Sequence, residues 1–198
     1  MEANKSKYLN AKKQFEETIA YLVEKISVFD PHILGADPKK CIFRIHRDIR
    51  FSKDKRPYKE NMGGFINREG RKGMDGGYYF HIQPGQSMLA GGVYMPPSDI
   101  LKKIRQEIDY NPDELLRFMN SKDFKNYFGA FEGDKLKKAP QGYDPGHPNI
   151  ELLKLKYYIV VHRVSDKDLL QTDFLDNATR VFKAMLPLNN YIRTALQD

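Results

Sequence analysis

Residues 77–95 read GYYFHIQPGQSMLAGGVYM, and this stretch decides the fold. Two short runs, apolar or alternating in character, flank the tetrapeptide QPGQ at residues 83–86. Within it, proline fixes one φ angle and glycine permits a positive φ, which favours a tight turn. The stretch therefore predicts an antiparallel β-hairpin from about Gly77 to Met95.

The residues before the hairpin predict a helix followed by further strands. Over 7–28, apolar residues recur every three or four positions, which is typical of a core-facing helix. The helix is expected to end at Asp30-Pro31, because the residue before a proline is pushed out of the α region. The short runs CIFRIH (41–46) and GGFIN (63–67) predict two more strands of an antiparallel sheet.

The residues after the hairpin predict helices, one long connection and a last strand. We expect a helix with Ser98 as N-cap, and a second that starts at Asn111, where the sequence NPDE supplies a cap, a proline and an acidic residue. The remaining expected elements are an ordered loop over 129–150, a strand over 157–164, and two helices near 172–185 and 188–197.

These elements predict an α+β fold made of one domain over 1–198. It consists of a mainly antiparallel sheet with an N-terminal helix and several C-terminal helices packed on it. No apolar run reaches about 18 residues and the first residues, MEANKSKYLN, form no apolar stretch, so we expect a cytoplasmic protein with no membrane partner. The single cysteine, Cys41, excludes an internal disulfide and is expected to be a small buried apolar residue.

The positive charge is concentrated in one part of the chain. Residues 39–72 contain 12 Lys and Arg against four Asp and Glu, a net charge of +8, whereas the whole chain carries +7. An anionic partner would therefore be attracted mainly by this window. A solvated basic face that only aids solubility is the alternative.

The segment FRIHRDIRFSKDKRPYKEN, residues 43–61, is the centre of this basic window. If its first part is extended, its side chains alternate between two faces. One face is expected to meet the core, with Phe43, Ile45, Arg47, Ile49 and Phe51, and the other then carries Arg44, His46, Asp48, Arg50 and Ser52. A buried Arg47 requires a partner such as Asp48 or a carboxylate elsewhere.

The same segment supplies the candidate site residues. Guanidinium groups beside lysines and hydroxyls suit a phosphate or carboxylate, so the expected ligand-binding set is Arg44, Arg47, Arg50, Ser52, Lys55, Tyr58 and Lys59. The candidate proton-transfer groups are Asp48, Tyr58 and His81. Tyr79, His81 and Gln83 share one face of the predicted strand and are candidates for the floor of a polar pocket. Arginines that only anchor a loop would give the same pattern.

Other interpretations of the basic segment are less favoured. A nucleic-acid-binding module that uses the 39–72 face is the second hypothesis, and a protein-interaction module is the third. The triplet His46-Arg47-Asp48 has the spacing of two iron ligands, but three residues are weak grounds, so we expect no metal and no cofactor. The sequence leaves open whether the protein is an enzyme and what its oligomeric state is.

Several motifs together resemble the bacterial and fungal family called domain of unknown function 2461. They are FRIHRDIRFSKDKRPYKEN, GYYFHIQPG, AGGVYMP with ILKKIRQEI, and LKKAPQGYDPGHP with LLKLKYY, and they occur in the family's order along nearly the whole chain. The resemblance implies no known activity. Family members usually begin with a further segment that contains a Trp-Phe pair, so the start of this chain is expected to lack about one short helix. The family often has tyrosine where this chain has His46, which argues against catalysis that needs a histidine there.

Overall fold

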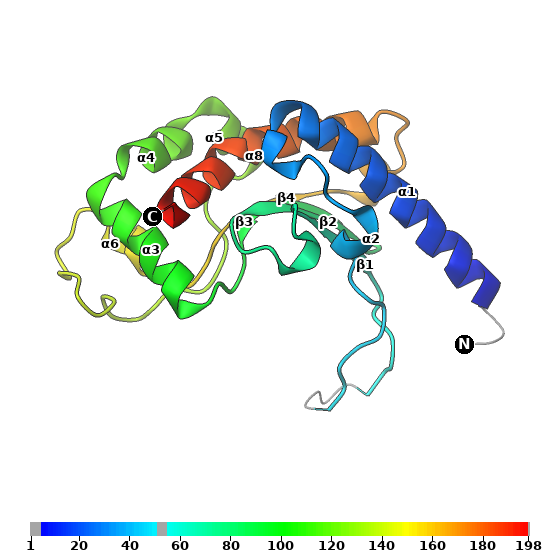
Figure 1. Cartoon of the computed structure of the whole chain (residues 1–198), viewed down its shortest axis with the longest axis horizontal. Coiled ribbons are helices and arrows are strands. Elements are labelled where there is room, and N and C mark those ends of the chain that lie inside the picture. The colour runs from blue at the N-terminus through cyan, green and yellow to red at the C-terminus, as the bar shows by residue number, and fades with distance from the viewer. Residues whose placement is uncertain (1–4, 51–54, 198) are drawn as a thin grey trace. The chain divides into compact units, whose positions relative to one another are not determined.

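The computed structural model describes residues 5–50 and 55–197, and it has the predicted α+β fold. The helical elements are α1 (Lys5–Phe29), η2 (Pro31–Ile33), α2 (Pro38–Cys41), η3 (Gly70–Lys72), α3 (Ser98–Tyr110), α4 (Asp113–Asn120), α5 (Lys122–Tyr127), α6 (Ile150–Leu153), α7 (Asp166–Leu169) and α8 (Phe174–Leu196) (Figure 1). The strands are β1 (Met62–Ile66), β2 (Gly77–Ile82), β3 (Met88–Val93) and β4 (Tyr158–Arg163).

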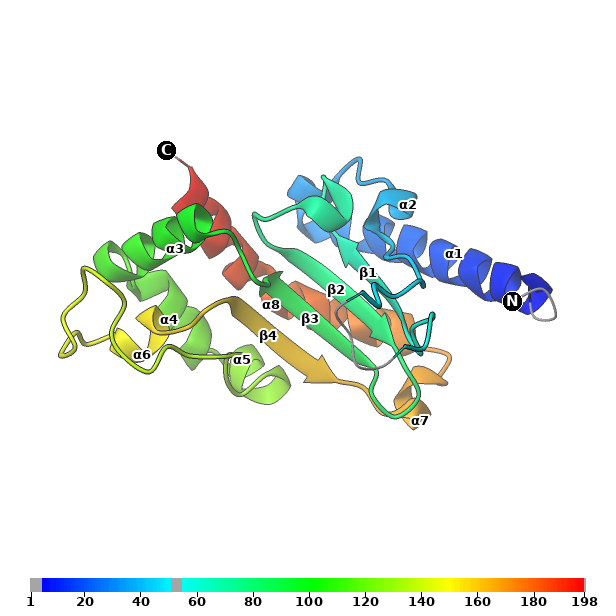
Figure 2. The same ribbon diagram turned by 90° about the horizontal axis from the view of Figure 1, so that it is seen from below.

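The strands of the described ranges pair as one antiparallel sheet in the order β1-β2-β3-β4, as Figure 2 shows. The predicted hairpin is confirmed as β2 and β3. Its turn is closed by a hydrogen bond from the backbone N–H of Gln86 to the carbonyl of Gln83, at 2.9 Å. Gly85 lies in this turn with φ at +70°, the conformation that a glycine adopts without strain.

The chain divides into two compact units, each made of three separate segments. Unit 1 holds the described residues of Met1–Gly73, Tyr79–Leu89 and Arg163–Thr179, and unit 2 those of Met74–Tyr78, Ala90–His162 and Arg180–Asp198. Strands β2 and β3 and helix α8 each contribute residues to both units. The single-domain assignment drawn from the sequence stays a prediction.

The core of unit 1 is built on the apolar stripe of α1. Phe15, Ile19, Leu22 and Ile26 are all buried, as the helical spacing predicts. The Phe15 ring stacks on Phe80 of β2 with ring centres 5.8 Å apart, and Phe80 in turn meets Phe174 of α8 at 6.1 Å. Helix α1 ends before Asp30, whose side chain accepts a hydrogen bond from the N–H of His32.

The core of unit 2 lies between its sheet residues and helix α8. Tyr78 of β2 packs edge-on against Phe182 of α8, with ring centres 5.5 Å apart. Gly91 of β3 lies against the side chain of Met185, so closely that a Cβ atom would be 2.6 Å from the sulfur. On the same strand, Gly92 has φ at +109° and faces the carbonyl of Tyr158 on β4.

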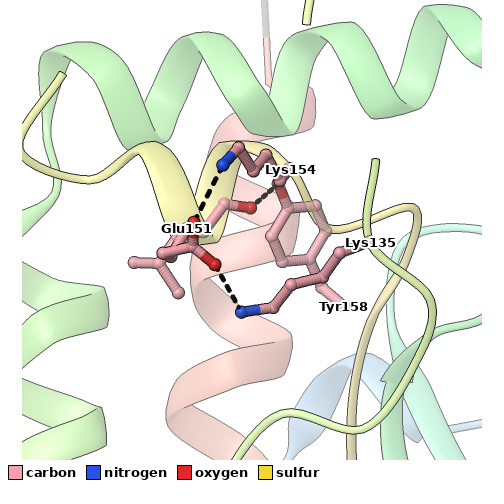
Figure 3. Close-up of polar contacts among 5 residues, drawn as sticks. Lys135, Glu151, Lys154 and Tyr158 are labelled. Carbon is pink, nitrogen blue, oxygen red and sulfur yellow. Dashed lines mark hydrogen bonds and ion pairs between the residues drawn. The ribbon is translucent and has the colours of Figure 1, made fainter. Parts of the chain in front are cut away.

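A clamp of hydrogen bonds fixes α6 and the long connection before it in unit 2. The guanidinium of Arg105 donates to the carbonyls of Leu153 and Leu155, at 2.8 and 3.0 Å. Figure 3 shows the buried Tyr158, which donates its hydroxyl to the backbone of α6, and Glu151, which accepts from Lys135 and Lys154. The connection is therefore ordered, as predicted, and these hydrogen bonds and ion pairs hold it in place.

Three local predictions are wrong. CIFRIH forms no regular strand, because Cys41 completes α2 and the residues after it form only isolated bridges, from Ile42 to Gly64 of β1 and from His46 to Tyr58. The N-cap residues are Pro97 and Pro112 instead of the expected Ser98 and Asn111, and the helices begin at Ser98 and Asp113. The two expected C-terminal helices are one, α8, which continues through Pro187 because buried residues on both sides of the proline hold it in the core.

Candidate functional site

The basic segment forms a two-armed ribbon in unit 1 between α2 and β1 (Figure 1). Backbone hydrogen bonds of 2.9–3.0 Å join the arms, from Lys59 to Ile45 and from Arg47 to Pro57, and another ties Phe43 to Gly63 of β1. Ile45, Arg47 and Ile49 are half-buried whereas their neighbours are exposed, so the predicted alternation is present. The predicted burial of this face in the core is absent, because the two arms of the ribbon pair with each other and Phe43 is exposed.

A hollow of about 710 Å³ lies beside the ribbon and is called the cationic hollow here. Its charged lining in the described part of the chain consists of Lys12, Lys39, Arg44, Lys59, Arg71, Lys72 and one carboxylate, Glu16. Glu16 faces Lys39 at 3.6 Å. Helices α1, α2 and η3 thus contribute cations that converge on those of the ribbon, and the excess of positive charge is large.

Lys59 is the most constrained of these cations. Its ammonium group lies over the Phe43 ring, 5.6 Å from the ring centre, in a cation–π contact. Partial burial, together with the nearby charge of Arg44, lowers the pKa of Lys59 below that of an ordinary lysine. A positive charge on Lys59 is therefore less favourable than on a fully exposed lysine.

A second hollow of about 420 Å³ is called the amide hollow here. Its lining comprises Arg47, Asp48, Arg56, Tyr58, Lys59, Glu60, Asn61 and Gln83. Lys59 and Asn61 line both hollows, so the two are adjacent. Asp48 accepts two hydrogen bonds from the guanidinium of Arg50, at 2.9 and 2.6 Å, and Arg56 bonds Glu60, so much of the charge here is neutralised locally.

A chain of hydrogen bonds on β2 leads to the amide hollow. The Tyr79 hydroxyl lies 2.9 Å from Nδ1 of His81, whose Nε2 lies 3.2 Å from Oε1 of Gln83. Gln83 Oε1 also accepts from Nδ2 of Asn61 at 3.5 Å. The expectation that Tyr79, His81 and Gln83 share one polar face is confirmed, and His81 lies behind the hollow rather than in its lining.

The candidate proton-transfer groups differ in their ionisation. The pKa of Asp48 is lowered by its hydrogen bonds from Arg50, so this exposed carboxylate stays ionised at neutral pH. Burial first, and the charge of Lys59 after it, lowers the pKa of His81, while the hydrogen bond with Gln83 opposes the shift. His81 is accordingly neutral at neutral pH, and Asp48 and Tyr58 are the candidates that line a hollow.

The lowered pKa of His81 predicts a pH-dependent stability. The unfolded chain binds a proton near pH 6.5, whereas the folded protein resists it, so stability present above pH 6.5 is lost as the pH falls toward the lower folded pKa. We expect His81→Gln to lose less stability than the parent between pH 7.5 and 5.0, measured by urea unfolding at both pH values. Equal losses in the two proteins would contradict the assignment.

The structure brings part of the predicted site together. Arg44 and Lys59 line the cationic hollow, and Arg47, Asp48, Tyr58 and Lys59 line the amide hollow. Arg50 is instead turned to Asp48, and Lys55 donates to the carbonyl of Ile49 at 3.0 Å. Ser52, Phe51 and Asp54 lie outside the described residues.

Several lining residues were not among the sequence candidates. Lys12 comes from α1, about thirty residues before the ribbon, and no local pattern relates the two. Lys39, Arg71 and Lys72 belong to the basic window, so the charge count carried the only signal for them. Asn61 and Gln83 are neutral and gave no charge signal, although Gln83 is on the face predicted to be polar.

The described residues show no metal centre and no membrane-crossing helix. Among them, no three His, Cys, Asp or Glu side chains lie close enough together to hold a metal ion. No helix in the same ranges combines the length and apolarity that are needed to cross a bilayer. Cys41 is buried, with its sulfur 3.9 Å from the carbonyl of Asn67, and burial raises its pKa.

Comparison with known proteins gives a single family assignment. The model of a family described as a conserved hypothetical protein (DUF2461) matches residues 1–191, which include the ribbon, the hairpin and both hollows. No curated protein and no solved structure matches the chain. The geometry of the two hollows is therefore the feature that bears on function.

Proposed function

The chain belongs to the DUF2461 family of conserved hypothetical proteins, and within that family assignment we propose that its cationic hollow binds an anionic small molecule. The ligand carries a phosphate or carboxylate group. Arginine offers such groups a planar pair of donors and lysine a mobile point charge, and both kinds of side chain line the hollow.

The observation that carries the proposal is the unbalanced charge around one concave space. Of the charged side chains described there, six are cations and one is a carboxylate. Like charges repel, and after partial burial the charge of Arg44 is the second cause that lowers the pKa of Lys59. A bound anion would relieve this repulsion. The volume of about 710 Å³ is in the range of ordinary ligand sites.

A neighbouring pair of lysines on α1 gives a matched test. Lys12 lines the hollow, whereas Lys13 is directed to Glu17 at 3.8 Å and is not part of the lining. We expect Lys12→Gln to weaken the binding of inorganic pyrophosphate about threefold to fivefold, the contribution of one exposed ion pair, by isothermal titration calorimetry. Lys13→Gln removes the same charge and is expected to leave the affinity unchanged. Equal effects of the two variants would show that only net charge matters.

Nucleic acid is the alternative ligand, because the ribbon is basic and carries the exposed Phe43. A labelled single-stranded oligonucleotide, titrated across a range of salt, separates the two. Under the proposal, pyrophosphate binds at Lys12 and Lys59. The oligonucleotide binds only weakly near physiological salt, and pyrophosphate displaces it. Micromolar oligonucleotide binding with a steep salt dependence, unaffected by pyrophosphate, would favour the nucleic-acid function instead. A cytoplasmic location is proposed from the sequence.

A further inference from the structure

The hydrogen-bond chain on β2 has one consistent set of proton positions. Gln83 Oε1 is only an acceptor, so the Nε2 atom of His81 must carry the proton that bonds it. In the neutral ring Nδ1 is then bare, and the Tyr79 hydroxyl donates to it. Asn61 supplies a second donor to the same Oε1. Neither contact uses Nε2 of Gln83.

The backbone of Gln83 is held as firmly as its side chain. Its N–H donates to Oγ of Ser87 at 3.0 Å, and its carbonyl accepts from that hydroxyl at 2.9 Å. The same carbonyl accepts from the N–H of Gln86, and Ser87 is buried. Both the backbone and the side-chain oxygen of Gln83 are therefore fixed where the residue lines the amide hollow.

The two adjacent hollows differ in chemistry. The cationic hollow presents six positive side chains and one negative one in the described part of the chain. In the amide hollow, Asp48 faces Arg50 and Glu60 faces Arg56, so neutral hydrogen-bonding groups make up most of what remains to meet a ligand. A molecule that spans both would have an anionic end and a neutral polar end.

We infer that the ligand is a phosphorylated polyol, such as a sugar phosphate, whose hydroxyl groups are bound by Gln83 and Asn61 while its phosphate lies in the cationic hollow. This rests on the proposed anion site. Tyr79 and His81 act as positioning residues, since they contact Gln83 or each other and do not line the amide hollow. Gly63 makes room for the Tyr79 hydroxyl, because a Cβ there would lie 2.6 Å from it.

The test compares probes that share a phosphate and differ in hydroxyl groups. Ribose 5-phosphate, glucose 6-phosphate and glycerol 3-phosphate are titrated against cyclohexylmethyl phosphate, with pyrophosphate as the probe for the anion site alone. We expect at least one hydroxylated probe to bind about tenfold more tightly than cyclohexylmethyl phosphate, as one or two neutral hydrogen bonds would give. Gln83→Met is expected to abolish this preference and leave pyrophosphate binding unchanged.

Two further variants separate positioning from structure. Gln86→Met changes an exposed glutamine of the same turn and is expected to keep the tenfold preference. Tyr79→Phe removes the hydroxyl that donates to Nδ1 of His81 and so supports its Nε2-protonated form, and we expect the preference to fall about threefold with pyrophosphate affinity intact. The ¹⁵N shifts of His81 are expected to report the Nε2-protonated ring in the parent and a mixture in Tyr79→Phe.

Failure of this inference is distinct from failure of the proposed function. If pyrophosphate binds and no hydroxylated probe is preferred, or if Gln83→Met retains the preference, the polyol assignment is wrong and the anion site stands. If neither pyrophosphate nor any phosphorylated probe binds, both are overturned. Retained pyrophosphate binding in each variant also shows that the variant is folded.

Discussion

Replacing Gly92 with alanine is expected to lower the free energy of unfolding by about 4 kcal/mol, the sum of a strained backbone and a steric clash. Gly92 has φ at +109°, which an alanine rarely adopts, and its new Cβ would meet the carbonyl oxygen of Tyr158. That oxygen belongs to the neighbouring strand β4 and cannot move without disturbing the sheet. For a chain of this length the melting temperature should fall by about 10 °C.

The control for this prediction is Gly142→Ala in the same unit. Gly142 also has a positive φ, +90°, but a Cβ added there would meet nothing within 4 Å. Its cost is therefore expected to be about 1 kcal/mol, from backbone strain alone. Chemical denaturation of the three proteins compares the two costs, and a Gly92→Ala variant no less stable than Gly142→Ala would refute the close strand contact.

Reversing the charge of Lys59 is expected to weaken pyrophosphate binding by about a hundredfold or more. Lys59 lines both hollows, and its partial burial makes its charge less screened than that of a fully exposed lysine. A glutamate in its place both removes an attraction and adds a repulsion to the ligand. Calorimetric titration of Lys59→Glu with pyrophosphate, beside the parent, measures the change.

Lys55→Glu is the matched control on the same ribbon. It carries the same change of charge, but the exposed Lys55 donates to the Ile49 carbonyl and lines neither hollow. We expect a loss of only a few-fold, from the longer-range field. A Lys55→Glu loss as large as that of Lys59→Glu would mean that the whole ribbon attracts anions without a defined site.

The accuracy of the sequence prediction followed how local each signal was. The hairpin was predictable because QPGQ closes its turn within four residues, and α1 because its stripe repeats along a single helix. The strand predicted over 41–46 is wrong, because alternating apolar residues also suit a ribbon whose two arms pair with each other. The two helices expected near 172–185 and 188–197 form the single helix α8, because buried residues on both sides of Pro187 hold the helix in the core.

The candidate site was predictable in its charge and only partly in its members. Lys59 and Arg44 follow from the basic segment, since the window itself carries the net charge. The part that Lys12 takes in the lining could not be predicted, because it depends on the tertiary packing of α1 beside the ribbon. Arg50 lines neither hollow, and its guanidinium donates to Asp48, the carboxylate two residues away.

The division of each unit into three segments has a consequence for synthesis on the ribosome. Unit 1 takes its last segment from Arg163–Thr179, which includes the Phe174 ring that packs on Phe80. At typical elongation rates of roughly 5–20 residues per second, the chain from Gly73 to Arg163 takes roughly 5–20 seconds to appear. During that interval the buried face of α1 lacks part of its partner surface. Unit 1 is therefore complete only after residues 163–179 have emerged.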